Sequence, residues 1–368
     1  MNEEFLDKKL QERKQANSLR SLILKYGKID FCSNDYLGIV KNNLLHAEKE
    51  NVSLPHSSTG SRLLSGNYSF IEETEMTVAS FHLAEAGLIF NSGYDANIGV
   101  LASVPQKGET IIYDQLSHAS IRDGIRLSFA ESLSFLHNDV ADLEKKLLKA
   151  SAGSGNIFVV TESVFSMDGD MASLDKILML CKKYNAFLIV DEAHATGVIG
   201  EMGEGLVQQI GLQDKCFARV HTFGKACGSH GAIVLGSGKL KEYLINFARP
   251  FIYTTALPPA AIAAVAASYK LFPGLTKERK QLQALTGFFK KNNFKYELIN
   301  SETPIQGVII PGNEAVKKTA NVLQENNFDV RAILYPTVPL GRERLRIVLH
   351  SFNTMDELAK LIAILNSA

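Results

Sequence analysis

A lysine and an aspartate stand out because each follows a short apolar run that is typical of a buried strand. Asp191 comes directly after Phe187–Val190, and Lys225 follows Val220–Phe223 at the start of a glycine-rich segment, Gly224–Gly231. A buried carboxylate needs a partner, and a lysine kept out of water reacts as the amine. A lysine that binds pyridoxal 5′-phosphate (PLP), with an aspartate on the pyridine nitrogen, is typical of PLP enzymes. The pair therefore predicts a PLP site.

Other interpretations of these residues remain open at this point. Asp191 is also suited to cap a helix N-terminus, and an isolated lysine usually lies on the surface. The string Asp191–His194 spells DEAH, the Mg²⁺-binding box of nucleic-acid helicases, which requires an upstream GxxxxGK[ST] loop. None of the Gly-Lys pairs at 27–28, 224–225 and 238–239 is followed by Ser or Thr. A nucleic-acid binder is therefore the alternative of a different class, and we expect neither nucleic acid nor a metal ion.

The phosphate of such a cofactor needs hydrogen-bond donors. Ser92-Gly93-Tyr94 follows the apolar run Gly87–Phe90 and leads into a helical pattern, so its backbone N–H groups should lie at a helix N-terminus, where phosphate binds. Thr222, three residues before Lys225, is a second candidate donor. A plain glycine turn is the simpler interpretation of the first segment.

The elements that must position these residues alternate along the chain. Apolar runs of a few residues alternate with helical stretches, of which Val140–Ala150 and Leu174–Tyr184 are examples. This order predicts an α/β fold with a mostly parallel sheet buried on both faces, and ligands of such sheets bind beyond the carboxyl ends of the strands. The expected strands are Gly87–Phe90, Thr110–Tyr113, Ile157–Val160, Ala186–Val190, Val220–Phe223 and Ala232–Leu235.

The two ends of the chain differ in character from this region. The first two dozen residues have the pattern of an amphipathic helix, with Phe5, Leu6, Leu10 and Leu19 among charges. After about Leu271, a smaller α+β domain is expected from helices at Thr276–Lys291 and Ala315–Asn326 and strands at Ile305–Ile310 and Arg344–Leu349. We expect an N-terminal arm over 1–37, a large domain over 38–272 and a small C-terminal domain over 273–368.

The composition agrees with an ordinary globular protein of about two domains. The 368 residues are 46% hydrophobic, and 39 basic residues balance 39 acidic ones, which argues against disorder and against wholesale nucleic-acid binding. The four cysteines show no CxxC or zinc spacing. With no signal-peptide pattern at the N-terminus, and only a short helix over 258–269 in the uncharged stretch 250–269, we expect a cytoplasmic protein without membrane contact.

Many segments of this chain, in order, resemble those of the α-oxoamine synthases, PLP enzymes of the fold-type I aminotransferase class. The resemblance covers nearly the whole chain and implies a large domain with a mostly parallel central sheet plus a smaller α+β C-terminal domain. It implies a homodimer with the active site at the interface. The matching segments are Phe31–Gly38, Gly60–Arg62, Ser92–Asn97, Leu116–Ser120, His137–Asp139, Val164–Asp170, Asp191–Gly197, Thr222–Lys225, Ile252–Thr255 and Pro336–Pro339.

The resemblance also implies roles for individual residues around the cofactor. Lys225 would bind PLP covalently and move the substrate's Cα proton, Asp191 would hold the pyridine nitrogen protonated, and His118 would stack on the ring and contact substrate. The remaining cofactor contacts would come from His194 and Ser166 at the phenolic oxygen, Gly93, Tyr94 and Thr222 at the phosphate, Thr255 at the phosphate of the other subunit, and Glu162 nearby.

Substrate contacts implied by the same resemblance lie toward both ends of the chain. Arg346 would bind the amino-acid carboxylate bidentately, assisted by Asn34, and Thr337 lies in a matching segment. Arg20 is our candidate for the far carboxylate of the acyl donor. His137-Asn138-Asp139 we interpret as a structural turn.

The segments most resemble the branch that joins L-alanine to pimeloyl-CoA, or its acyl-carrier-protein equivalent, with loss of CO₂ in biotin synthesis. Branches that use glycine with acetyl-CoA, or serine with a long acyl-CoA, are the alternatives. The N-terminal segment is short, Ile71 replaces a frequent histidine, and Leu334 replaces a frequent arginine, while Arg331 lies nearby. These departures concern recognition of the acyl chain, not the PLP chemistry.

Overall fold

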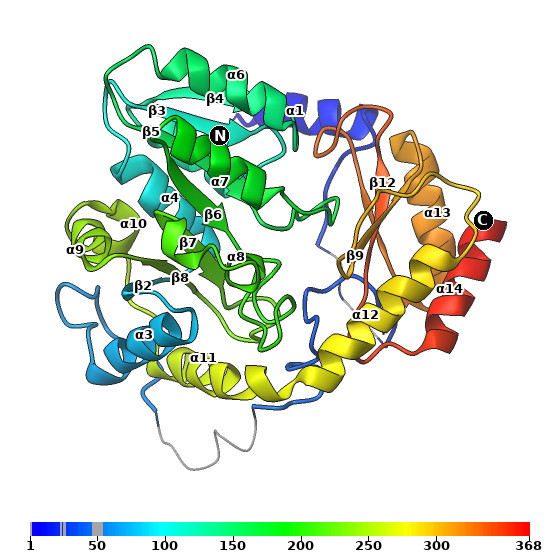
Figure 1. Cartoon of the computed structure of the whole chain (residues 1–368). Coiled ribbons are helices and arrows are strands. Elements are labelled where there is room, and N and C mark those ends of the chain that lie inside the picture. Colours follow the sequence, from blue (N-terminus) through cyan, green and yellow to red (C-terminus); the bar gives the residue numbers. More distant parts are fainter. Residues whose placement is uncertain (1, 23, 25–26, 46–53) are drawn as a thin grey trace. The chain divides into compact units, whose positions relative to one another are not determined.

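The computed structural model describes residues 2–22, 24, 27–45 and 54–368, which form two compact units (Figure 1). The large unit comprises residues 37–165 and 171–279. The small unit comprises 1–36, 166–170 and 280–368. No helix among the described residues is long and apolar enough to cross a membrane.

A seven-stranded sheet with the order β2-β8-β7-β6-β5-β3-β4 forms the centre of the large unit. Strands β7, β6, β5, β3 and β4 run parallel, and β8 is antiparallel to both of its neighbours, β7 and β2. The mostly parallel sheet was therefore predicted correctly. The strands are β2 (Ala86–Phe90), β3 (Thr110–Asp114), β4 (Glu131–Phe135), β5 (Ile157–Glu162), β6 (Phe187–Asp191), β7 (Ala218–Thr222) and β8 (Ala232–Gly236).

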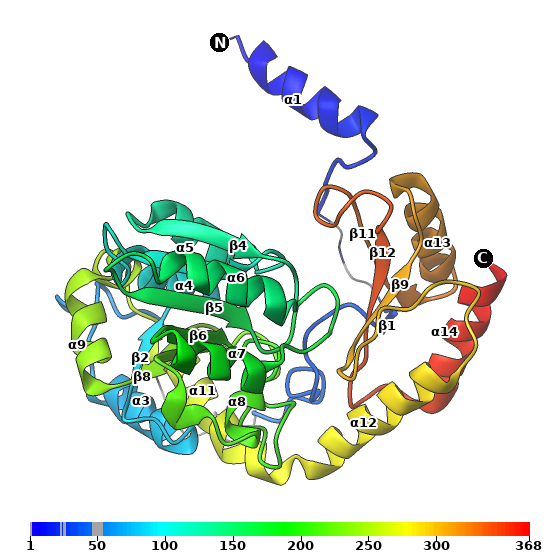
Figure 2. The ribbon, with the colours of Figure 1, turned by 45° about the horizontal axis from the view of Figure 1, so that its top comes forward.

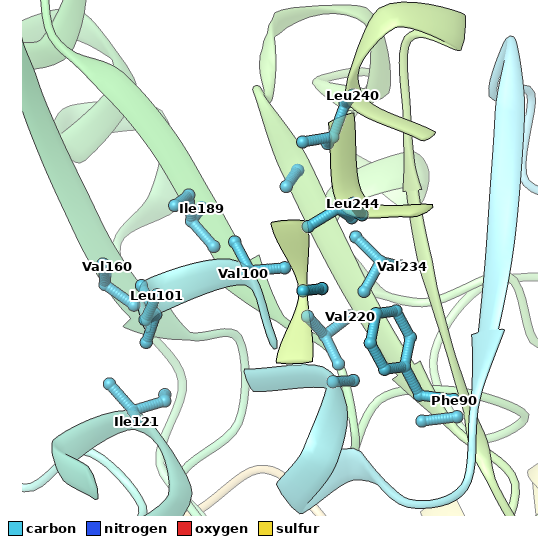
Figure 3. Packing of buried hydrophobic residues seen from close by; sticks show 14 of the residues in the cluster. Phe90, Val100, Leu101, Ile121, Val160, Ile189, Val220, Val234, Leu240 and Leu244 are labelled. Carbon is cyan, nitrogen blue, oxygen red and sulfur yellow. The ribbon is translucent and has the colours of Figure 1, made fainter. Parts of the chain in front are cut away.

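Helices cover both faces of this sheet, and alternate residues of each strand point to opposite faces. Val160 of β5 packs in a cluster with Val100, Leu101 and Leu244 from helices α4 and α9 (Figure 3). Phe158 of the same strand belongs to this cluster as well. Helices α6 and α7 lie on the other face (Figures 1 and 2). The helices are α3 (Ser69–Phe81), α4 (Gly93–Ser103), α5 (Ala119–Leu127), α6 (Val140–Ala150), α7 (Leu174–Lys183), α8 (Leu206–Gln209), α9 (Gly238–Phe247), α10 (Arg249–Ile252) and α11 (Pro259–Leu271), with 3-10 turns at Gln213–Lys215 and Phe272–Gly274.

The small unit is an α+β arrangement built from both ends of the chain. Its antiparallel sheet has the order β11-β12-β9, and β1 pairs with β10 in parallel. Because β1 forms this pair and Phe31 is fully buried in the core of this unit, the first 36 residues belong to it and not to a separate arm. The elements are α1 (Glu4–Gln15), β1 (Ile29–Asp30), α12 (Thr276–Lys291), β9 (Ile305–Ile309), α13 (Asn313–Glu325), β10 (Phe328–Asp329), β11 (Arg331–Ile333), β12 (Arg344–Val348) and α14 (Met355–Ser367).

The N-terminal helix is shorter than predicted. It ends at Gln15, and Asn17 takes a φ of +50°, a left-handed conformation that commonly ends helices. Leu19 therefore lies outside the helix, and none of the helix residues is buried. The amphipathic pattern does not reflect packing within a single chain.

Two histidines with rings in close contact are buried in the large unit. The His82 and His221 ring centroids lie 3.9 Å apart, and both residues are fully buried. Burial, and then the Arg219 charge, lower the pKa of His82 to about 3. Burial, and then His82, lower the pKa of His221 well below its ordinary value. The folded protein therefore keeps both rings neutral at pH values where an unfolded chain would protonate them.

This pair predicts acid sensitivity. Between about pH 6.5 and pH 3 the histidines are protonated in the unfolded state but not in the folded state. As the pH is lowered through this range, the free energy of unfolding should therefore fall by about 1.4 kcal/mol per pH unit for each such ring. Denaturant unfolding between pH 6.5 and 4.5 measures this slope. His82→Gln should make the slope shallower, whereas His56→Gln, at an exposed position, should not. Equal slopes in both variants would contradict the assignment.

Candidate active site

Asp191 is the last residue of β6 and only 6% exposed. Its Oδ1 accepts a hydrogen bond from the backbone N–H of Ala193 at 2.8 Å, and its Oδ2 accepts one from Asn97 Nδ2 at 2.7 Å. Turns follow it, and the next described helix, α8, begins only at Leu206. The helix-cap interpretation is therefore wrong, and the carboxylate is held at a buried strand end.

Lys225 lies in the loop that joins the antiparallel strands β7 and β8. Hydrogen bonds of 2.8 Å from Phe223 N–H to Gly231 O and from Ser229 N–H to Phe223 O close this loop, and Gly231 has a φ of +104° that favours glycine. Because β6 and β7 are neighbours in the sheet, Asp191 and Lys225 leave adjacent strands at the same edge. Lys225 is half-buried.

The start of α4 and the end of β7 approach closely enough to form a phosphate cradle. A Cβ atom at Gly93 would collide with Thr222 Cγ2, so only glycine allows this approach. The backbone of Gly93 and Tyr94 opens α4, and Ser92 caps it by accepting from Asp95 N–H at 3.0 Å. Exposed backbone donors at a helix N-terminus, next to a hydroxyl, suit a phosphate group.

His118 and Glu162 show how the charges of the site interact. Burial, and then the Asp191 charge, raise the pKa of Glu162 to about 8, although its Oε1 accepts the His118 backbone N–H at 2.6 Å. Partial burial of the His118 ring lowers the pKa of His118, with Asp191 acting in the opposite direction and Lys225 in the same direction. His118 as a residue is exposed, so its ring is accessible.

The remaining predicted cofactor residues differ in burial and in the unit to which they belong. His194 is 6% exposed in the turn after β6, whereas Thr255 is exposed and its backbone carbonyl accepts from Asn91 Nδ2 at 2.7 Å. Ser166 belongs to the small unit. Every other predicted cofactor residue belongs to the large unit.

A second group of predicted residues surrounds Arg346 in the small unit. Arg346 donates from Nε to the carbonyl of Ser166 at 2.6 Å and from NH2 to Asn34 Oδ1 at 3.0 Å, and is 8% exposed. Tyr36 also donates to Asn34 Oδ1 at 3.2 Å. Burial raises the pKa of Tyr36 to about 12, against the effect of Arg346, so Tyr36 stays a neutral donor. These contacts fix the orientation of a guanidinium that suits a carboxylate.

Arg20, the predicted acyl-donor residue, meets Thr337, another predicted substrate-binding residue, in the small unit. Arg20 NH2 donates to Thr337 Oγ1 at 3.2 Å, and both residues are exposed. Leu334 packs against the core of this unit, and Arg331 pairs with Asp329 at 2.8 Å. Because Arg331 is engaged in this ion pair, the structure does not indicate that it takes the place of the family arginine whose position Leu334 occupies.

The segment His137–Asp139 forms the turn network that the sequence suggested. Asp114 accepts from His137 Nδ1 at 3.0 Å and from Asn138 N–H at 2.9 Å, and Asn138 takes a φ of +53°. These bonds fix the end of β3 next to the loop that carries His118.

The large-unit residues fit PLP. A buried carboxylate and a lysine leave adjacent strands, and a cradle that excludes any Cβ lies at the same strand ends. In sequence, the chain matches the family "Aminotransferase class I and II" over residues 26–362. It is 40% identical to the 8-amino-7-oxononanoate synthase of Emericella nidulans, over 96% of this chain and 92% of that protein. The putative 8-amino-7-oxononanoate synthase of Bacillus licheniformis is also 40% identical, over 98% of this chain and 96% of that one.

The chain belongs to the α-oxoamine synthase family. Solved structures agree: a variant serine palmitoyltransferase from S. paucimobilis with a bound PLP–myriocin aldimine superposes with a TM-score of 0.88 at 27% identity, covering 99% of this chain and 96% of that one. An 8-amino-7-oxononanoate synthase from Francisella tularensis gives 0.77 at 30% identity, covering 92% and 97%. As a member of this family the chain is a PLP-dependent acyltransferase of fold type I, which rules out the helicase alternative.

Three residues of these two groups received no role from the sequence. Asn97 donates a hydrogen bond to Asp191, and Ser120 forms one with His118. Tyr36 donates one to Asn34. All three lie inside segments that resemble the family, which was the only signal available. The contacts of Asn97 join segments far apart in the chain, whereas the Ser120–His118 and Tyr36–Asn34 bonds are local.

Proposed function

We propose that this α-oxoamine synthase condenses L-alanine with a pimeloyl thioester to give 8-amino-7-oxononanoate, CO₂ and the free thiol. The observation that carries the proposal is the 40% identity, over nearly the whole chain, to relatives named for that product. In the reaction the alanine Cα bonds to the thioester carbonyl carbon and the C–S bond breaks. The alanine carboxylate leaves as CO₂, and a proton returns to Cα.

The chain's residues have separable tasks in this reaction. When bound, PLP supplies an electron sink that stabilises negative charge at the substrate Cα. Lys225 holds the cofactor and carries the Cα proton, the Asp191 carboxylate balances positive charge on the ring nitrogen, and Arg346 binds the alanine carboxylate with Asn34 in support. The cradle of Gly93, Tyr94 and Thr222 binds the phosphate.

Serine palmitoyltransferase activity is the second candidate, favoured by the higher TM-score of that structure. The sequence argument carries more weight because substrate choice depends on side chains, whereas the TM-score compares backbones. The test is release of the free thiol across alanine, glycine and serine, each with pimeloyl, acetyl and palmitoyl thioesters. The fastest turnover with alanine and the pimeloyl donor supports the proposal, and a preference for serine with the palmitoyl donor overturns it.

The proposal includes a homodimer in which Thr255 contacts the cofactor phosphate of the partner's site. Ser61 forms a β-bridge with Thr255, and the neighbouring side chains of Leu63, Leu64 and Tyr253 are 50%, 86% and 72% exposed. Clustered exposed apolar side chains are typical of a protein interface. Light scattering of the purified protein should give the mass of two chains, and a single-chain mass would contradict the shared site.

Recognition of the pimeloyl carboxylate by Arg20 gives a prediction of its own. Loss of a charge-assisted hydrogen bond costs about 1.5–3 kcal/mol, so Arg20→Ala should lower kcat/KM for pimeloyl-CoA by roughly ten- to a hundredfold. A donor whose distal carboxylate is methylated should be spared. Arg13→Ala is the matched control, because Arg13 is an exposed arginine of α1. Equal losses for both donors would contradict carboxylate recognition.

A further inference from the structure

A chain of hydrogen bonds joins Asp191 to His118 through two side chains that have no part in the reaction as described. Asn97 Nδ2 donates to Asp191 Oδ2 at 2.7 Å and to Ser120 Oγ at 2.9 Å, and Ser120 Oγ lies 2.8 Å from His118 Nδ1. Asn97 and Ser120 are 3% and 1% exposed. The link between the two functional residues is therefore shielded from water.

The chemistry of the partners fixes the direction of every bond in this chain. A carboxylate only accepts, so the amide of Asn97 must turn its NH₂ group toward Asp191, and its second proton then points at Ser120. Ser120 Oγ accepts from Asn97 and keeps its own proton, which it can donate to His118 Nδ1. The backbone N–H of Ser120 also donates to Nδ1, at 3.2 Å. With two donors aimed at it, Nδ1 carries a lone pair and the ring proton lies on Nε2.

We propose that Asn97 and Ser120 are positioning residues that link the Asp191 carboxylate to the His118 ring and hold that ring as the neutral Nε2–H tautomer. They act through Asp191 and His118, the two residues expected to contact cofactor and substrate. A neutral ring with one fixed orientation adds no positive charge beside the protonated ring nitrogen that Asp191 would stabilise. This catalytic meaning rests on the proposed function, whereas the tautomer itself does not.

The tautomer can be measured on the cofactor-free protein, without any substrate. In ¹⁵N-histidine-labelled protein, long-range ¹H–¹⁵N spectra distinguish the two neutral tautomers, and His118→Gln assigns the signal by its loss. Wild type should show His118 as Nε2–H at pH 7. Ser120→Ala removes one donor to Nδ1 and should raise the pKa of His118 by about half a unit to one unit. Ser301→Ala removes a buried hydroxyl from the small unit and should leave the signal unchanged.

Asn97 is tested through cofactor binding as well. Asn97→Ala leaves Asp191 without one donor and should weaken PLP binding in a fluorescence titration by roughly tenfold. If that variant does not fold, Asn97→Asp preserves the shape, and the new carboxyl must share a proton with Asp191. PLP affinity should then depend more steeply on pH between 5 and 8 than that of wild type. Ser120→Thr keeps the hydroxyl and should restore the His118 signal.

The outcomes separate this inference from the proposed function. An Nδ1–H or charged His118 in the wild type, or an unchanged His118 signal in both Ser120→Ala and Asn97→Ala, overturns the inference whatever the substrate. If His118 of the wild type behaves as expected but the enzyme prefers serine, the inference stands and only the proposed substrate is wrong.

Discussion

Replacing Lys225 with alanine is expected to abolish covalent binding of PLP and to lower kcat by at least about a hundredfold to ten-thousandfold, the usual contribution of a positioned proton-transfer group. The reason is structural, because Lys225 lies in a closed hairpin loop at the strand end next to that of Asp191. Among the predicted site residues, Lys225 is the one lysine, so no other predicted residue supplies an amine that could bind the cofactor. The measurement is kcat for thiol release with alanine and the pimeloyl donor.

Chemical trapping gives the independent readout for this prediction. Borohydride reduction of the wild type followed by peptide mapping should place the pyridoxyl mass on Lys225. Lys239→Ala is the matched control, because Lys239 also follows a glycine but is exposed at the start of α9. This variant should still carry the pyridoxyl mass on Lys225. The pyridoxyl mass on Lys239, or on no residue, would refute the assignment of the cofactor lysine.

Asp191→Asn is expected to preserve the fold and to lower the rate of Cα proton removal by about a hundredfold to a thousandfold. A neutral amide cannot balance the charge of a protonated ring nitrogen. A shift of two to three units in the pKa of that nitrogen corresponds to roughly 3–4 kcal/mol, which is on the order of 10²–10³ in rate when fully expressed in the transition state. Exchange of the alanine Cα proton with deuterium, followed by NMR, measures this step directly.

The control for this variant is Asp175→Asn, an exposed aspartate in the first turn of α7. It should exchange the proton at the wild-type rate, and both variants should unfold at similar denaturant concentrations. Near-normal exchange in Asp191→Asn would show that this carboxylate serves only its neighbours Asn97 and Ala193.

Apolar patterning predicted the strands that carry the site, because a parallel sheet buried on both faces leaves continuous apolar runs. The same reasoning missed β4, Glu131–Phe135, whose ESLSF sequence contains no apolar run and whose residues are mostly exposed at the sheet edge. It also placed Phe223 in a strand, whereas β7 ends at Thr222. Edge strands and strand ends depend on neighbours that local sequence does not reveal.

The candidate site was predictable in its residue types but not in its connections. Asp191 and Lys225 stood out because each follows an apolar run, and the resemblance to a known family supplied most of the other roles. The hydrogen bonds from Asn97 to Asp191 and Ser120 cross 94 and 23 positions of sequence. Such contacts appear only after the fold has brought α4, α5 and β6 together.

The pairing of β1 with β10 also has a consequence for how the protein is made. Ile29 pairs with Phe328, about 300 residues later, so the ribosome must synthesise almost the whole chain before this pair can form. At roughly 5–20 residues per second, the first 36 residues wait about 15 to 60 s for their partners. The two segments of the large unit, 37–165 and 171–279, are complete before most of the small unit has been translated. The N-terminal segment, including Phe31, therefore remains accessible to chaperones and proteases for most of synthesis.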